Sequence, residues 1–200
     1  MSLELQNKNR KVKTGLFFGS FNPIHTGHLI IANYMIEFTD IERVWFIVSP
    51  QNPFKIHDFL IPEHHRLKMV QLAITDNNNM EALDFEFLLP KPSFTINSLR
   101  HLGEKYPGHD FTIIMGSDNL AGFHKWKGYE EIITRYKLFV YHRDGHDNQQ
   151  LKVHANVRVF DAPVLNISAT FIREVLSAKK SIRYLVTPEV LNYIKEKDLY

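Results

Sequence analysis

The fold of this chain is decided by residues 12–28, which read VKTGLFFGSFNPIHTGH. Residues 12–18 are mostly apolar and end at Gly19, which is typical of a short buried strand. Residues 26–38 then carry apolar side chains at a spacing that fits a helix packed against a sheet. A buried strand, a turn with glycine and a helix in this order indicate the first unit of an α/β fold.

The remaining chain repeats this alternation of strand and helix. We expect further strands at residues 43–49, 82–87, 111–115, 137–141 and 157–160, and further helices at 62–75, 93–102, 129–134, 169–178 and 188–197. Because the strands are apolar throughout, the sheet should be mostly parallel and covered on both faces. The pattern predicts a Rossmann-like, doubly wound α/β fold, with one domain at 12–200 and a flexible lead-in at 1–11. Arg66 is expected in an exposed helix start.

The composition narrows the function classes. Of 200 residues, 44% are hydrophobic and 23% are charged, as in a globular protein, and the absence of cysteine excludes thiolate metal sites and cysteine nucleophiles. A net charge of +2 gives no reason to expect a nucleic acid polymer as partner. No apolar run approaches the roughly 20 residues of a membrane span. We therefore expect a cytoplasmic protein without a membrane partner, and a homo-oligomer is left open.

The turn after the first strand has the features of an anion site. In an open parallel sheet, ligands bind beyond the carboxyl ends of the strands, where free amides at a helix start favour phosphate. His25 and His28 are three residues apart, so both imidazoles can face the same side of the first helical turn. The alternatives are an ordinary loop, or a zinc pair that lacks an evident third ligand. The absence of a G-x-G-x-x-G fingerprint disfavours a hydride-transfer enzyme.

Two motifs resemble those of a known superfamily. The decapeptide GSFNPIHTGH at 19–28 is similar to the first signature of the nucleotidylyltransferases, and ISATFIR at 167–173 is similar to their second. The motifs PSFT at 92–95 and GSD at 116–118 resemble one branch, the bacterial nicotinate mononucleotide adenylyltransferases. Trp126 and the closing segment 191–200 look like the same branch, so the resemblance covers nearly all of residues 14–200.

The resemblance implies transfer of AMP from ATP to a pyridine mononucleotide, with release of pyrophosphate. Catalysis can then rest on alignment and charge stabilisation, because the attacking 5′-phosphate needs no protein base. His25, His28 and Arg173 are implied as contacts to the ATP phosphates. Mg²⁺ is expected to arrive bound to ATP rather than in a cage of carboxylates.

The same resemblance implies further contacts to the nucleotide. They are Gly19, Ser20, Phe21, Lys55, Gly116, Asp118, Ile167, Ser168 and Thr170. For several of these residues a purely structural role stays open: Ser168 as a helix N-cap, Asp118 as a helix cap, and Lys55 as a solvated loop lysine. A surface ion pair is the corresponding alternative for Arg173.

At the acceptor end the resemblance implies Trp126, Lys127 and Thr95. The face of a tryptophan attracts and stacks on a cationic pyridine ring, whereas Trp45, inside an apolar strand, is expected in the core. Thr95 has a helix-cap role as its alternative. Other readings of the whole chain are the same chemistry with nicotinamide mononucleotide or another phosphate acceptor, or an ATP-binding sensor without turnover.

Overall fold

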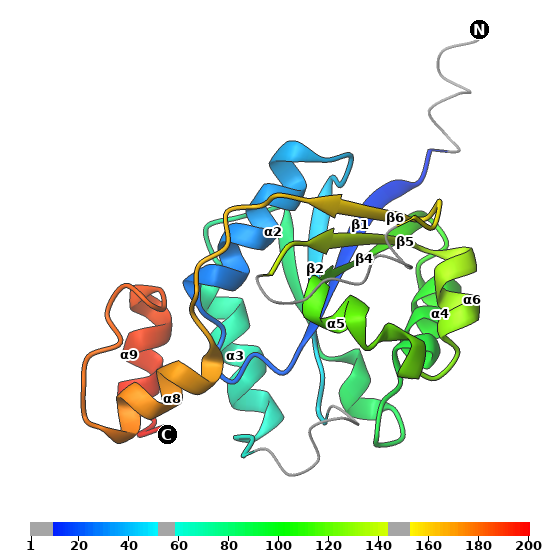
Figure 1. The fold of residues 1–200 in the computed structure, drawn as a ribbon. Helices are drawn as coiled ribbons and strands as arrows, with labels where there is room; N and C mark the ends of the chain where they lie inside the picture. The colour runs from blue at the N-terminus through cyan, green and yellow to red at the C-terminus, as the bar shows by residue number, and fades with distance from the viewer. Residues whose placement is uncertain (1–9, 52–58, 144–152) are drawn as a thin grey trace, which may run out of the picture.

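The computed structural model describes residues 10–51, 59–143 and 153–200, and its centre is a sheet of six strands, all parallel to their neighbours (Figure 1). The strands are β1 (Val12–Gly19), β2 (Arg43–Val48), β3 (Met80–Leu83), β4 (His109–Gly116), β5 (Lys137–Tyr141) and β6 (Val157–Phe160). Their spatial order is β3-β2-β1-β4-β5-β6. The predicted doubly wound α/β fold is confirmed.

Helices cover both faces of this sheet. They are α2 (Thr26–Phe38), α3 (Glu63–Ala73), α4 (Thr95–Lys105), α5 (Ser117–Ala121), α6 (Tyr129–Arg135), α8 (Ala169–Ser177) and α9 (Pro188–Glu196), with 3₁₀ turns η1 (Phe85–Leu88) and η2 (Phe123–Lys125). Successive strand residues point to opposite faces, so Phe17 joins the core under α2 and α3 while Leu16 joins the core under α4 and α6. Trp45 is 3% exposed in the second core, as predicted.

Two predicted element boundaries are wrong. The strand expected at 82–87 ends at Leu83, and the chain continues as η1. Ser93 does not cap the next helix, because α4 begins at Thr95 with Phe94 in the N-cap position. The Ser93 hydroxyl instead donates a hydrogen bond to the buried carboxylate of Glu86 at 2.9 Å. The Ser93 hydroxyl, which the local pattern assigned to the helix, thus binds a carboxylate seven residues earlier in the sequence.

The prediction for Arg66 is also wrong. Its neighbours at the start of α3 are exposed or half-buried, but Arg66 itself is completely buried. A guanidinium is normally left in water because its desolvation is costly, and sequence pattern alone therefore favours exposure. Here four backbone carbonyls accept its hydrogen bonds.

The chain reverses its direction of winding between β1 and β4. β1 pairs with β2 on one side and with β4 on the other, so the helices that follow β1 and β4 leave the sheet toward opposite faces. Such a switch point opens a crevice at the carboxyl ends of the two strands. The helices α8 and α9 lie together beside α2 and α3 (Figure 1).

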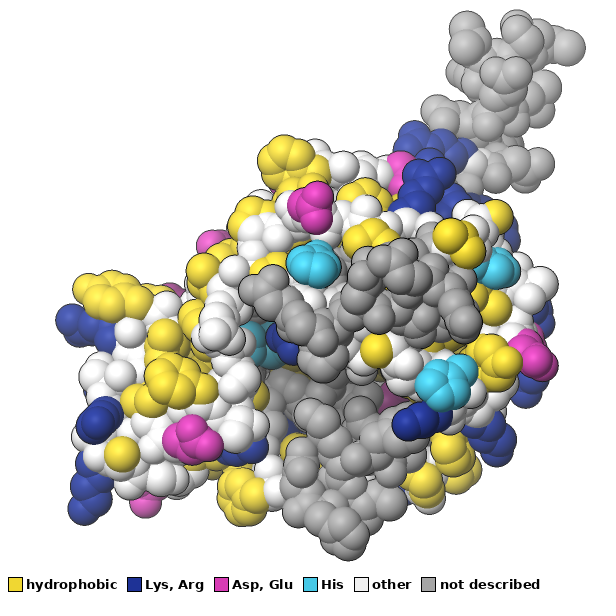
Figure 2. Space-filling model, in the orientation of Figure 1, with side chains coloured by type: hydrophobic (Ala, Val, Ile, Leu, Met, Phe, Trp, Pro, Cys, Tyr) yellow, Lys and Arg dark blue, Asp and Glu magenta, His cyan; other side chains and the backbone are white. Residues whose placement is uncertain are grey.

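Charges are mixed on the surface. On the face seen in Figure 2, Lys and Arg side chains are spread among acidic and apolar ones, with a group beside the N-terminal segment (Figure 2). Among the helices of the described residues, none has the length and apolar character needed to cross a membrane.

Candidate active site

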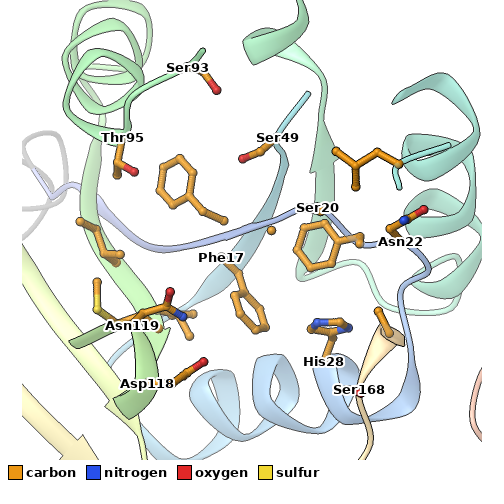
Figure 3. Close-up of a pocket in the computed structure, with 18 of the residues that line it drawn as sticks. Phe17, Ser20, Asn22, His28, Ser49, Ser93, Thr95, Asp118, Asn119 and Ser168 are labelled. Atoms are coloured by element: carbon orange, nitrogen blue, oxygen red, sulfur yellow. The ribbon is translucent and has the colours of Figure 1, made fainter. Parts of the chain in front are cut away.

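A cavity of about 510 Å³ lies at the carboxyl edge of the sheet. It is lined by the turn after β1, the ends of β2 and β4, the starts of α4 and α8, and the η2 segment (Figure 3). The predicted site residues that line it are His25, His28, Arg173, Gly19, Ser20, Phe21, Thr95, Asp118, Trp126, Lys127, Ser168 and Thr170. Gly116 and Ile167 do not line it, and Lys55 lies outside the described residues. The cavity volume is within the usual range of small-molecule sites.

The two histidines form a stacked pair at one wall of the cavity. Their ring centroids are 3.7 Å apart with an interplanar angle of 29°. The backbone N–H of His25 donates to Nδ1 of His28 at 3.3 Å, which assigns the proton of a neutral His28 ring to Nε2. His25 is 4% exposed, and its Nδ1 has no hydrogen-bond partner among the described residues. Because Nδ1 of His25 is buried and Nδ1 of His28 is occupied, the Nε2–H of His28 is the donor that this pair can offer to a ligand.

Both imidazoles favour the neutral form in the absence of a ligand. Burial and the nearby positive charge of Arg143 lower the pKa of His25 to about 4. Burial also lowers the pKa of His28 well below its usual value, with smaller contributions from His25 and Arg143. The positive charge of Arg143 acts on both rings and favours an anion at this end of the cavity.

Arg173 reaches the same end of the cavity from α8. Its Nη1 donates to the backbone carbonyl of Asn22 at 2.8 Å, and its Nη2 donates to the Thr170 hydroxyl at 3.3 Å. Ser168 is the N-cap of α8, since its hydroxyl accepts a hydrogen bond from the Phe171 N–H at 3.1 Å. The capping alternative for Ser168 is thus realised, and its side chain lines the cavity as well.

The β1 turn is strained at Phe21. This residue has φ = 46°, in the left-handed region that bulky residues avoid. Its ring packs over Gly19, where an added Cβ would meet ring carbons at 2.8 and 2.9 Å. The glycine that the sequence associated with phosphate approach is therefore required, first of all, by the Phe21 ring.

Asp118 and Arg143 face each other across the ends of β4 and β5. Asp118 Oδ2 lies 3.4 Å from Arg143 Nη1, and Asp118 Oδ1 is buried without a hydrogen-bond partner among the described residues. The helix that follows β4 has Gly116 as N-cap and no side-chain cap, so Asp118 does not have the capping role. A Cβ on Gly116 would lie 2.2 Å from Asp118 Oδ1, which explains the glycine although it does not line the cavity.

The opposite end of the cavity is built from half-buried and exposed side chains. Trp126 is half-buried and packs against Phe123, with ring centroids 5.3 Å apart. Lys127 places its Nζ 4.6 Å from the centre of the Phe94 ring. Thr95 is the first residue of α4, makes no side-chain cap and lines the cavity. In Figure 3, Ser93 and Thr95 lie at one end of the view, and His28 and Ser168 at the other.

Sequence reasoning missed several residues that line the cavity. The most important are Arg143, Asn22 and Glu86. Arg143 could have been found by the rule that located the histidine turn, because it directly follows a parallel strand. Glu86 had no local signal: it is 2% exposed, and the hydroxyls of Ser93 and Ser98 donate to it from the α4 region. Burial raises the pKa of Glu86, against the effect of these hydroxyls.

The described residues around the cavity do not form a carboxylate cage for a metal. Within the ranges that the structure describes, no group of three or more His, Asp or Glu side chains could hold an ion by itself. Glu86 is occupied by hydroxyl groups and Asp118 faces Arg143, so neither forms part of a carboxylate cage. A metal that binds through substrate phosphates, as magnesium commonly does, would need no such cage.

A parallel sheet with paired histidines and arginines at its switch point defines a nucleotide-binding α/β protein of the phosphate-transfer type. Comparison with known proteins is more specific. Residues 16–175 match the cytidylyltransferase-like family model. The chain is 51% identical over 189 residues to a probable nicotinate-nucleotide adenylyltransferase of Cytophaga hutchinsonii, covering 94% of this chain and 98% of that protein. It is 44% identical to one of Bacteroides thetaiotaomicron, covering 94% of each.

Solved structures show the same fold. A Plasmodium falciparum nicotinic acid mononucleotide adenylyltransferase complexed with NaAD has a TM-score of 0.78 at 20% identity, covering 94% of this chain and 97% of that one. A putative nicotinate-nucleotide adenylyltransferase of Vibrio parahaemolyticus has a TM-score of 0.68 at 25% identity, covering 92% and 98%. The chain belongs to the cytidylyltransferase-like family and, within it, to the nicotinate-nucleotide adenylyltransferases.

Proposed function

We propose that this protein transfers the adenylyl group of ATP to nicotinate mononucleotide, giving nicotinate adenine dinucleotide and pyrophosphate in NAD biosynthesis. The observation that carries the proposal is the convergence of His25, His28 and Arg173 on one cavity that has Trp126 at another part of its wall. The 51% identity with a probable nicotinate-nucleotide adenylyltransferase supports the same reaction. The cavity and the sequence identity together support the predicted enzyme class, a nucleotidyltransferase.

The histidine end of the cavity is assigned to the triphosphate. His28 Nε2–H can donate to a phosphate oxygen, because Nδ1 is already an acceptor for the His25 backbone. Arg173 presents a planar guanidinium that is fixed by Asn22 and Thr170, so little freedom is lost when it meets phosphate. Ser168 and Thr170, at the start of α8, add hydroxyls and helix amides.

Asp118 and Trp126 are assigned to the two nucleosides. The carboxylate of Asp118, which lines the cavity, can accept hydrogen bonds from ribose hydroxyls of the adenosine part. Trp126 offers a half-buried aromatic face to the pyridine ring, with Thr95 and Lys127 beside the ring's carboxylate. Gly19, Ser20 and Phe21 line the cavity from the turn after β1 and are proposed as further contacts to the nucleotides. Lys55 is proposed as a further phosphate contact.

The reaction needs alignment more than proton transfer. The acceptor 5′-phosphate is largely a dianion at neutral pH and attacks the α-phosphorus, while the bond to the pyrophosphate oxygen breaks. His28 and Arg173 stabilise the charge that develops on the departing pyrophosphate. Mg²⁺, when it is bound with ATP, neutralises part of the triphosphate charge. We place the reaction in the cytoplasm, where ATP is available.

A pyrophosphate-release assay with ATP and a panel of acceptors tests the proposal. Nicotinate mononucleotide is expected to give the highest kcat/KM, ahead of nicotinamide mononucleotide and phosphopantetheine. A preference for nicotinamide mononucleotide would show that the acceptor is assigned wrongly, while adenylyl transfer itself would stand. Binding of ATP without pyrophosphate release with any acceptor would point to a sensor and contradict the enzyme assignment.

A further inference from the structure

Arg66 connects three segments from a position behind the cavity. From α3, its Nε donates to the carbonyl of Ile61 at 3.0 Å, and Nη1 donates to the carbonyls of Ser20 at 2.6 Å and Ser49 at 2.7 Å. Nη2 donates to the carbonyl of Pro50 at 3.1 Å. Ser20 follows β1 and Ser49 follows β2, so one side chain joins the carboxyl ends of two neighbouring strands to the start of a helix.

In the part of the chain that is described, the hydrogen-bond acceptors of this buried charge are carbonyl groups, and the charge of Glu63 acts on it without a hydrogen bond. Glu63, on the same helix, forms its ion pair with Lys91 at 3.0 Å instead. Burial lowers the pKa of Arg66, but a guanidinium keeps its proton in proteins. A buried ion of this kind is a poor source of stability compared with an apolar residue such as Met69, which is fully buried on the same helix. The arginine therefore calls for a reason other than stability.

The hydrogen bonds of Arg66 fix the direction of peptide groups that line the cavity. Ser20 and Ser49 are cavity residues, whereas Arg66 is not. In a trans peptide the carbonyl and the next N–H point in opposite directions, so a Ser20 carbonyl aimed at Arg66 turns the N–H of Phe21 away from it. Phe21 is also the residue with the strained φ of 46°, a conformation that costs on the order of 1–3 kcal/mol unless its surroundings impose it.

We propose that Arg66 is a positioning residue for adenylyl transfer, which holds the peptide groups after β1 and β2 in the orientation that the nucleotides require. This inference rests on the proposed function, because it concerns the same cavity. Arg66 acts through Ser20 and Ser49 and has no contact with substrate itself. The relevant property of Arg66 is its planar guanidinium with several N–H donors. A lysine keeps the charge but cannot reach carbonyls in three segments at once.

Arg66→Lys and Arg66→Met test the proposal against a matched control, Met69→Ala. The control removes a buried side chain of the same helix that does not line the cavity. Each variant is compared at a temperature where circular dichroism shows it to be folded. We expect both Arg66 variants to lose about 10- to 100-fold in kcat, as misplaced groups do, with a raised KM for the mononucleotide. Met69→Ala should lose thermal stability to a similar degree and keep both kinetic constants.

Three results would overturn the inference. The first is an Arg66→Lys protein with wild-type kcat and KM. The second is an equal loss of activity in Met69→Ala, which would make the effect one of general stability. The third is failure of both Arg66 variants to fold while Met69→Ala folds, because Arg66 would then be needed for the fold itself. If the wild-type protein releases no pyrophosphate, the proposed function fails, and calorimetric affinity for nicotinate mononucleotide in the same variants still decides the role of Arg66.

Discussion

The histidine end and the tryptophan end of the cavity are built by different means. At the first, buried His25, the cap of α8 and the bonds between Arg173 and Asn22 leave each group little freedom. At the second, Trp126 and Lys127 are half-buried or exposed and are held mainly by ring contacts. The groups that must stabilise charge during the reaction are thus fixed by hydrogen bonds, although Ser168 and Thr170 are exposed, whereas the groups that must recognise a ring are held by ring contacts. This difference predicts kcat effects at one end and KM effects at the other.

The largest expected effect on activity is at the histidine end. His28→Ala removes a donor to the transition state and should lower kcat by on the order of 100-fold or more, as loss of one such donor does elsewhere. Steady-state pyrophosphate release measures the effect. His101→Ala, an exposed histidine of α4 outside the cavity, is the matched control and should keep wild-type activity. Near-normal turnover in His28→Ala would contradict the prediction that substitutions at the histidine end act on kcat.

The lowered pKa of His25 should make the folded protein less stable in acid. The pKa of His25 is about 4 in the native state against an ordinary 6.5, so the unfolded chain binds a proton that the native protein excludes. Stability that is present above pH 6.5 is therefore lost as the pH falls toward 4. His25 alone should lower the free energy of unfolding by about 2 kcal/mol between pH 7 and pH 5. Urea unfolding at both pH values measures this difference.

His25→Asn isolates the contribution of His25 from other titrating groups. The raised pKa of Glu86 works in the opposite sense, since its contribution is present at low pH and is lost as the pH rises through its native pKa. His28, whose pKa is lowered too, adds to the loss in acid. The asparagine variant should thus show a visibly flatter dependence on pH. An unchanged dependence would mean that His25 is already protonated in the native protein.

A smaller effect on activity is expected at the tryptophan end. Trp126→Ala removes a stacking and cation–π surface worth about 1 kcal/mol, which raises the KM for nicotinate mononucleotide about fivefold. The KM for ATP and the kcat should stay close to wild-type values, because the half-buried indole lies apart from the histidine pair. Initial rates over a range of both substrates give the separation. A fall in kcat without a change in KM would show that this end also contributes to the transition state.

The smallest effect is spectroscopic. The chain has two tryptophans, and Trp45 is 3% exposed within the core, so the fluorescence that responds to the mononucleotide should be that of Trp126. Partial quenching on titration is expected, and it should be absent in Trp126→Ala. Quenching that persists in that variant would assign the response to Trp45 and a change in the core.

Sequence reasoning succeeded where the signal was local. The β1 turn was found because strand, glycine, histidine and helix follow one another in a few residues, and the ISATFIR segment was found through its resemblance to a superfamily motif. It failed where a residue's role depends on distant partners. Ser93 binds Glu86 rather than capping α4, and Arg66 binds carbonyls up to 46 residues away. Arg143 was missed although it obeys the same rule, because its segment was read only as a polar loop.

Asn22 gives the first turn a dependence on much later parts of the chain. Its side-chain amide donates to the carbonyl of Phe59 at 2.7 Å, its Oδ1 accepts from the Tyr200 hydroxyl at 2.9 Å, and its backbone carbonyl accepts from Arg173 at 2.8 Å. During synthesis on the ribosome, Asn22 is made more than a hundred residues before two of these partners. The strand beneath it can pair early, but the turn reaches its native geometry only late in translation, and a nascent chain carries the signature motif long before it carries a nucleotide site.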